Sequence, residues 1–510
     1  MSSTYLGLSI ASSGLNAAQI GLATTTNNIS NIDTTGYSRQ LVNQTSVGPA
    51  AVYSSSLVGN GVNVTSVDRA HSDSLDQKYW QENSAASGWS AKSTYLSQLE
   101  TVFGSTTNDT TTSTISTALD TFNTDLENLS SDSTSTAARA TVLAQASTLC
   151  STLNDTASEL TQLRSDINNE VQTTVNQINS YTTQIADLNK QISVATASGG
   201  SANELEDQED VVVDKLSGLV GVTVTKSTTG TLNITMGNST LVDGRESKQL
   251  ECSTVTDTKS AEYGMYGIYD ATSGKTVTTG ASGALNSYLE LRDGASSASK
   301  GIPYYTSQLN EFAQTLAKSF NEGITVGTTT YSGNAAGYGL DNTTDIRFFS
   351  YDNKSSADFI SGTTTSTTAI DAAYTNITAA NITVSKDIQE DSGKIAASAA
   401  ANSTSNNTNL ADMISISQSA DIFGNTTATG FYGSMIATVG TDSASATTQY
   451  NRKSALTSYI NTSRSSVSGV SSNEETVNLS KYQAAYAASG SVTSTWSKIY
   501  DEMLNMVVSS

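Results

Sequence analysis

The sequence contains few of the residues from which most catalytic and metal sites are built. Its 510 residues include one histidine, two cysteines and two prolines. A single histidine excludes every metal site that needs two imidazoles, and only His71 could complete a Ser-His-Asp or Cys-His arrangement. We therefore interpret His71 as an ordinary polar residue at the start of a helix. The sequence predicts no catalytic residues, no cofactor and no metal site, and hence a protein that is not an enzyme.

Basic residues and long apolar runs are also scarce. The chain has 25 Lys and Arg against 47 Asp and Glu, a formal charge of -22, which excludes nucleic acid and anionic membranes as partners because both bind cationic patches. No run reaches the length of a membrane span, and no basic residue precedes an apolar core at the N-terminus, so we expect no conventional secretory signal. Cys150 and Cys252 are too few and too far apart for a disulfide framework, which predicts two free thiols.

The chain is nevertheless expected to fold. Its length predicts roughly three domains, and its 36% hydrophobic content lies above that of disordered chains. The acidic run from Glu204 to Asp210 lacks the alternating Asp/Asn spacing and the internal glycine of an EF-hand loop. We interpret this run as a solvated helix face.

The clearest periodic signal lies at the two ends of the chain. Near each end, apolar and small residues recur at two positions of a seven-residue repeat, as in the seam of a coiled coil. The N-terminal positions hold Leu8, Leu15, Leu22 and Ile29, and Ala11, Ala18, Thr25 and Ile32. The C-terminal positions hold Tyr482, Ser489, Trp496 and Met503, and Ala485, Val492, Ile499 and Met506. Because each seam needs a partner, we expect the two terminal helices to pair with each other and then to pack against neighbouring copies.

Three glycines interrupt the N-terminal repeat at its own spacing. Gly7, Gly14 and Gly21 each lower helix stability by roughly 1 kcal/mol relative to alanine. The isolated helix should therefore be marginal.

The middle of the sequence combines long helices with β-rich segments. Helices are predicted over residues 72–103, 115–129 and 137–194, from about 284 past Pro303 to 321, and beyond 386. Short strands are predicted from about 40 to 67 and from about 222 to 283. Between Ile167 and Val171 a four-residue step shifts the apolar repeat of the longest helix, which is a stutter.

The resulting fold class is mainly α with β-rich inserted domains, in an elongated multidomain rod with paired N- and C-terminal coiled-coil helices. We expect a terminal coiled-coil domain, a long-helix domain, a β-rich outer domain and a variable surface insert. The terminal domain spans 1–66 with 470–510, and the long-helix domain spans 67–202 with 284–322 and 386–469. The β-rich domain spans 203–283 and the insert 323–385.

Several segments resemble the axial proteins of the bacterial flagellum. The sequence NNISNIDTTGYSRQ, residues 27–40, resembles the N-terminal signature of rod, hook and hook-associated proteins, with Asn28, Asn31, Gly36 and Tyr37 in a signature turn. Thr35 stands where a proline is common, and Glu209 stands where an arginine is usual. The segments that resemble the hook-associated protein 1 family are residues 175–192, 203–224 and 283–323 and the closing helix.

This resemblance implies a structural adaptor that polymerises between hook and filament, outside the cell. The terminal helices would form the innermost tube, with copies of the same chain as neighbours. The hook subunit would lie on one side, and a second junction protein and the filament on the other. Export would use the flagellar type III apparatus, after a cytoplasmic chaperone binds the C-terminal helix. Our hypothesis is that Gly7, Gly14 and Gly21 keep the N-terminal segment unfolded for this export. The alternatives are a hook or filament subunit and, in a different class, a secreted adhesin.

Overall fold

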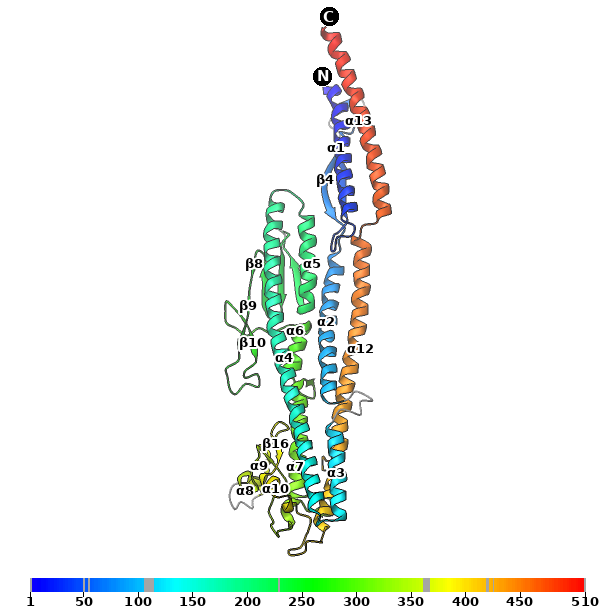
Figure 1. Cartoon of the computed structure of the whole chain (residues 1–510). Helices are drawn as coiled ribbons and strands as arrows, with labels where there is room; N and C mark the ends of the chain where they lie inside the picture. The colour runs from blue at the N-terminus through cyan, green and yellow to red at the C-terminus, as the bar shows by residue number, and fades with distance from the viewer. Residues whose placement is uncertain are drawn as a thin grey trace.

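The chain forms an elongated, mainly helical molecule with several small sheets (Figure 1). This computed structural model describes residues 2–48, 51–53, 56–104, 114–227, 230–360, 367–418, 422–424 and 426–508. The N- and C-termini lie at the same end of the molecule. The predicted fold class, an elongated helical rod with β-rich parts and paired terminal helices, is confirmed.

The terminal region consists of two helices and two small antiparallel sheets. Helix α1 (Ser2–Ser30) packs along α13 (Ser472–Val508) and also contacts strands β1 (Gln40–Ser46) and β4 (Val62–Arg69). Strands β1 and β4 pair with each other, and β2 (Ala51–Tyr53) pairs with β3 (Ser56–Val58). The sequence therefore predicted correctly that the two ends of the chain meet.

Four long helices build the rod below this region. They are α2 (Asp73–Val102), α3 (Ile115–Ser131), α4 (Thr136–Ala197) and α12 (Ala428–Ser468), and α2 packs along α12. The first three match their predicted ranges to within a few residues. Three of the four helices, α3, α4 and α12, begin at a hydroxyl cap. Thr114, Ser135 and Thr427 accept hydrogen bonds from the amides of Thr117, Ala138 and Gly430 respectively, which satisfies free donors of the first turn.

Helix α4 passes through two hydrophobic cores. Its N-terminal part, up to Ile167, packs with α3 and with α7 (Ile302–Glu322), whereas its part from Val171 onward packs with α5 (Asn203–Leu219) and the neighbouring strands. The change of partner falls at the stutter seen in the sequence. A shifted repeat turns the apolar face of the helix by part of a turn, which lets one helix serve two differently placed cores.

The β-rich region begins with α5 and continues into two antiparallel sheets. One sheet has the order β5-β6-β7-β8 and the other pairs β9 with β10. The strands are β5 (Val222–Lys226), β6 (Leu232–Met236), β7 (Ser239–Asp243), β8 (Glu246–Ser247), β9 (Leu250–Thr254) and β10 (Tyr266–Asp270). As predicted, both cysteines are free thiols; Cys150 is buried and Cys252 half-buried.

The prediction of one helix from 284 to 321 is wrong. Helix α6 (Ala284–Asp293) ends before a short hairpin of β11 (Ala295–Ser296) and β12 (Ser299–Lys300), and α7 begins after it. The Gly301 amide donates to the Gly294 carbonyl at 2.9 Å and closes the hairpin. Pro303 lies in the first turn of α7, where its missing N–H is not needed. The proline therefore starts a second helix.

The interpretation of residues 323–385 as a surface insert is also wrong in part. Phe348 and Phe349 are fully buried in the core that the N-terminal part of α4 forms with α3 and α7. The Phe348 ring lies 5.9 Å from that of Phe122 on α3. Asn321 at the end of α7 fixes the segment, because its side chain donates to the Phe349 carbonyl at 2.7 Å and accepts from the Phe349 amide at 2.8 Å. The segment lacks helical periodicity because it contributes apolar residues from short elements and turns.

The remaining elements of this segment and its continuation are short. They are β13 (Ile324–Val326), β14 (Thr329–Tyr331), η1 (Asn334–Ala336), β15 (Phe349–Tyr351), α8 (Ser356–Phe359), α9 (Thr367–Tyr374), β16 (Ile382–Val384), α10 (Lys386–Glu390), η2 (Ser392–Lys394) and α11 (Thr408–Gln418). Strand β13 pairs with β14 and β15 with β16, both antiparallel.

Candidate assembly site at the paired chain ends

Helices α1 and α13 run antiparallel, with the glycines of one against the large side chains of the other. Gly7 faces Trp496, Gly14 faces Ser489 and Gly21 faces Tyr482. A Cβ atom on Gly7 would overlap the indole ring, and one on Gly21 would lie 2.5 Å from the phenol ring. The glycines therefore let the two backbones approach closely around these rings. This packing explains their seven-residue spacing; the hypothesis that they serve export stays a prediction.

The predicted seam residues divide into a covered set and an exposed set. On α1, Ala11 and Ala18 are buried, Leu8, Leu15, Leu22 and Ile29 are half-buried, and Ile32 is exposed. On α13, Tyr482, Trp496 and Met503 are half-buried, whereas Ala485, Val492, Ile499 and Met506 are exposed. The structure thus brings one heptad position of α13 against α1 and leaves the other uncovered in the single chain. We call Ala485, Val492, Ile499 and Met506 the exposed stripe.

The signature turn connects α1, β1 and α13 through one buried side chain. The Asn28 amide nitrogen donates to the Gln40 carbonyl at 3.0 Å and to Glu475 Oε2 at 3.2 Å. Its amide oxygen accepts from the Tyr37 hydroxyl and from the Gln40 amide, both at 2.9 Å. Since Asn28 is buried, losing these partners would leave polar groups unsatisfied. Its hydrogen bonds fix the point where the terminal pair meets the rest of the molecule.

The turn rests on helix α5. Gly36 has φ +83, a conformation that favours glycine, and it lies so close to Val211 that a side chain would overlap. The Ser38 amide donates to Asp207 Oδ2 at 2.8 Å. Asn31 instead holds the end of α1, because its side chain donates to Asn27 Oδ1 at 2.9 Å.

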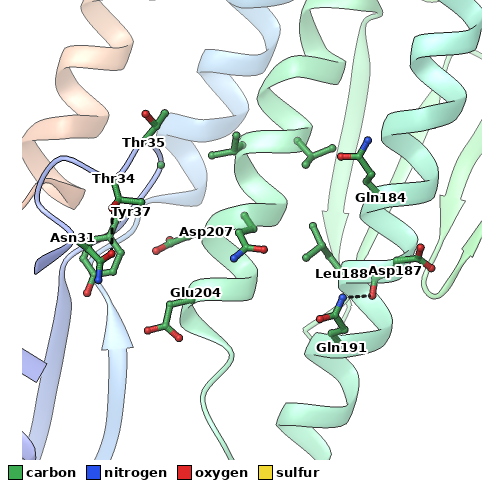
Figure 2. Close-up of a pocket in the computed structure, with 14 residues that line it drawn as sticks. Asn31, Thr34, Thr35, Tyr37, Gln184, Asp187, Leu188, Gln191, Glu204 and Asp207 are labelled. Carbon is green, nitrogen blue, oxygen red and sulfur yellow. Dashed lines mark hydrogen bonds between the residues drawn. The ribbon is translucent and has the colours of Figure 1, made fainter. Parts of the chain in front are cut away.

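Beside this contact lies a groove of about 570 Å³ between the turn, α4 and α5. Figure 2 shows Glu204 and Asp207 of α5 on the side of the helix that faces the turn, with the polar α4 side chains Gln184 and Gln191 across the groove. The turn therefore contacts α5 through Gly36 and Ser38 and also lines one wall of this groove.

The interpretation of the acidic run as a solvated helix face is wrong. Arg69, at the end of β4, binds three of its carboxylates: Nε lies 2.9 Å from Glu206, and Nη1 lies 2.8 Å from Asp207 and 2.6 Å from Asp210. All four side chains are largely buried. Sequence reasoning missed Arg69. The available signal was that Glu206, Asp207 and Asp210 share one helix face, a spacing that a single buried cation can serve.

Glu209 lies in the same run without such compensation. It is 2% exposed, and its Oε1 atom has no hydrogen-bond partner among the described residues. Burial, together with the nearby Asp210 and Glu206 carboxylates, raises the pKa of Glu209 to about 8, although Lys226 and Arg69 act in the opposite direction. Near neutral pH this carboxyl group is therefore largely protonated.

A second arginine holds the junction from the side of α12. Arg464 Nε lies 2.6 Å from Asp76 Oδ1 on α2, and Nη1 lies 2.9 Å from Asp214 Oδ2 on α5. The Arg39 amide donates to the Ser468 carbonyl at 2.8 Å, where α12 ends. His71 lies just before α2, as predicted, and its ring lies between the carboxylates of Asp73, Asp76 and Asp210. Arg464 therefore joins α12 to α2 and α5, and the Arg39 amide joins the end of α12 to the terminal region.

Comparisons with known proteins agree with this architecture. The family model described as flagellar hook-associated protein FlgK helical domain matches residues 96–341, and the model for flagella basal body rod proteins matches residues 8–37. Flagellar hook-associated protein 1 of Bacillus subtilis (strain 168) is 29% identical over 346 residues, which are 63% of this chain and 67% of that protein. Over these parts the chain is similar to the flagellar hook-associated protein 1 family. This family is one of structural flagellar proteins.

Other relatives match over a shorter part. Flagellar hook-associated protein 1 of Escherichia coli (strain K12) is 27% identical over 243 residues, which are 47% of this chain and 43% of that protein. The solved structure of the flagellar hook junction protein FlgK from Burkholderia pseudomallei matches with a TM-score of 0.60 at 18% identity, over 77% of this chain and 100% of that one. At this identity the likeness to the solved structure concerns the fold. No helix in the described part of the chain is both long and apolar enough to cross a membrane.

Proposed function

We propose that this chain is a non-enzymatic adaptor that polymerises between the hook and the filament of a bacterial flagellum. The observation that carries the proposal is the exposed stripe on α13. Val492 is 46% exposed, Ile499 38% and Met506 63%, although the other heptad position of the same helix is covered by α1. An apolar stripe beside an ordered helix pair is typical of a surface that a partner covers.

Neighbouring copies of the same chain are the proposed partners of this stripe. Burying apolar area contributes roughly 25 cal/mol per Å², and this gain would offset the ordering of two helices that are marginal when isolated. The hook subunit would bound the ring on one side, and a second junction protein and the filament on the other. The similarity to flagellar hook-associated protein 1 and the pairing of the two chain ends support this arrangement.

Export and location follow from the same proposal. The protein would leave the cell through the flagellar export apparatus without a cleavable signal peptide and would function outside the cell. Before export, the exposed stripe requires cover against aggregation. A cytoplasmic chaperone bound to α13 would provide that cover.

A charged residue in the exposed stripe tests the proposal. We expect Ile499→Asp to leave the monomer folded, because the side chain is partly exposed, but to prevent packing with neighbours. Electron microscopy should then show hooks without filaments, with filament subunits released into the medium. Leu15→Asp, in the partly covered α1 seam, should give the same result.

The matched control is Ser497→Asp, which introduces the same charge at an exposed position on another side of α13. It should permit normal filaments. Normal filaments on Ile499→Asp would contradict the proposed interface. A deletion strain that lacks hooks, instead of keeping hooks without filaments, would identify the chain as a hook subunit.

A further inference from the structure

Three potential ligand atoms converge just before and within the first turn of α2. Nε2 of His71 lies 3.0 Å from Asp73 Oδ1 and 2.9 Å from Asp76 Oδ2, and all three atoms lie within 4.8 Å of one another. One imidazole nitrogen carries at most one proton and cannot donate in line to two carboxylates. Hydrogen bonding by His71 therefore leaves at least one of the two oxygens without a donor.

Asp76 has an oxygen that lacks a hydrogen-bond donor. The residue is 3% exposed, and Arg464 binds its Oδ1 atom at 2.6 Å. Its Oδ2 atom has no hydrogen bond of acceptable geometry among the described residues, although it points at His71 from 2.9 Å. Leaving a buried carboxylate oxygen without a hydrogen-bond donor costs more free energy than leaving a neutral polar group without its partner. A cation placed between the three side chains would remove this penalty.

The surroundings favour a cation and leave room for water. The adjoining α5 carboxylates Glu206, Asp207, Asp210 and Asp214 outnumber the basic side chains that pair with them, which are Arg69, Lys226 and Arg464. A cavity of about 150 Å³ adjoins His71 and Asp73, and the unpartnered Glu209 also lines it. That volume accommodates several water molecules.

We propose that His71, Asp73 and Asp76 bind one divalent cation of the manganese or zinc class, with water from the cavity completing the coordination. One imidazole nitrogen and two carboxylate oxygens suit these metals, whereas calcium is held by oxygen ligands alone. The site differs from the sequence-based expectation of no metal site. That expectation excluded sites with two imidazoles, and this one uses a single imidazole.

The position of the site gives the ion a structural role. Asp76 is bound through its other oxygen to Arg464 of α12, and His71 Nδ1 lies 3.8 Å from Asp210 of α5. A bound ion would therefore order the start of α2 against α5 and α12, where the terminal region joins the rod. Asp73, whose side chain is 78% exposed, would be held in place by the ion.

The test is a metal titration of the full-length monomer after removal of metals with a chelator. Mn²⁺ binding is followed by electron paramagnetic resonance and Zn²⁺ binding by calorimetry, at about pH 8, where most imidazoles are neutral, and at physiological salt, which screens weak surface binding. We expect one site per chain, weakened at least tenfold by Asp73→Asn and by His71→Ala. Asp73 is exposed enough for its asparagine variant to fold, which circular dichroism verifies.

The control is Asp120→Asn, which removes the same charge from an exposed position of α3 and should leave binding unchanged. The proposal is overturned if the unaltered chain has no metal site. It is also overturned if the His71 and Asp73 variants bind the metal as tightly as the unaltered chain. A loss of the same size in Asp120→Asn would also overturn it, since it would indicate a general effect of charge. Because the titration uses the monomer, its result is independent of the proposed role in assembly.

Discussion

Helices α4 and α13 carry similar apolar repeats and bury them to very different extents. In the stripe of α4, Leu160 and Ile178 are completely buried. In α13, Val492 and Ile499 occupy corresponding repeat positions and remain exposed. The difference teaches that a heptad repeat identifies an apolar face but does not identify what covers it.

The physical cause lies in the number of neighbours within the chain. Helix α4 is packed by α3 and α7 along one part and by α5 and the strands along the other. Helix α13 extends beyond the rod and has α1 along one side (Figure 1). One neighbour can cover one stripe of a helix, so the second stripe of α13 stays exposed in the single chain.

The largest expected contrast is between truncations in the two stripes. Leu160→Ala leaves a cavity in a closed core and should lower the free energy of unfolding by about 2–5 kcal/mol. Val492→Ala removes an exposed side chain and should change it by less than about 0.5 kcal/mol. Urea unfolding of the monomer, followed by circular dichroism, measures both. Equal effects would mean that the α13 stripe is covered within the monomer.

A smaller contrast separates two glycines in helices. Gly21→Ala gains roughly 1 kcal/mol of helix propensity, but its methyl group would lie 2.5 Å from the Tyr482 ring, and such overpacking costs about 1–3 kcal/mol. We expect faster hydrogen exchange in α13 because the helix pair weakens.

The matched change is Gly433→Ala in α12, where no described atom lies within 4 Å of the added methyl group. It should stabilise its helix by about 0.5–1 kcal/mol. If Gly21→Ala instead slows exchange in α13, the glycines are not required by packing, and the hypothesis that they serve export gains support.

A further expected effect concerns Glu209, near the boundary between the terminal region and the rod. Its pKa is about 8 in the folded chain, above the ordinary value of 4.5. The folded state therefore retains the proton while the unfolded state loses it, so stability is greatest below the unfolded pKa and falls as pH rises toward 8. Because water in the adjoining cavity can solvate the carboxylate, we expect a fall of about 1–2 kcal/mol.

Glu209→Gln should remove this part of the pH dependence and stabilise the chain at pH 8. Thermal unfolding between pH 5 and pH 8, with a chelator present, measures it. The control is Glu204→Gln on an exposed position of α5, which should leave the pH profile nearly unchanged. Identical profiles for Glu209→Gln and the unaltered chain would mean that the carboxyl group is solvated.

Much of the fold could be predicted because the regular spacing of apolar residues identifies long helices in the sequence. The extents of α2, α3 and α4, the stutter at Ile167 and the meeting of the chain ends all follow from where apolar side chains must be buried. The resemblance around Asn28 and Gly36 also identified a turn that proves to be a buried polar junction. The helix extents, the stutter and the glycine of the turn are encoded locally, so the sequence alone determines them.

Tertiary structure decided which groups meet across long separations. The burial of the acidic run depends on Arg69, more than 130 residues earlier in the chain, and the burial of Phe348 depends on Phe122 of a distant helix. The convergence of Asp76 with Arg464 likewise joins α2 to α12. A charge or an aromatic ring in the sequence does not specify its partner. Its burial is favourable only once the packed helices bring that partner within a few ångströms.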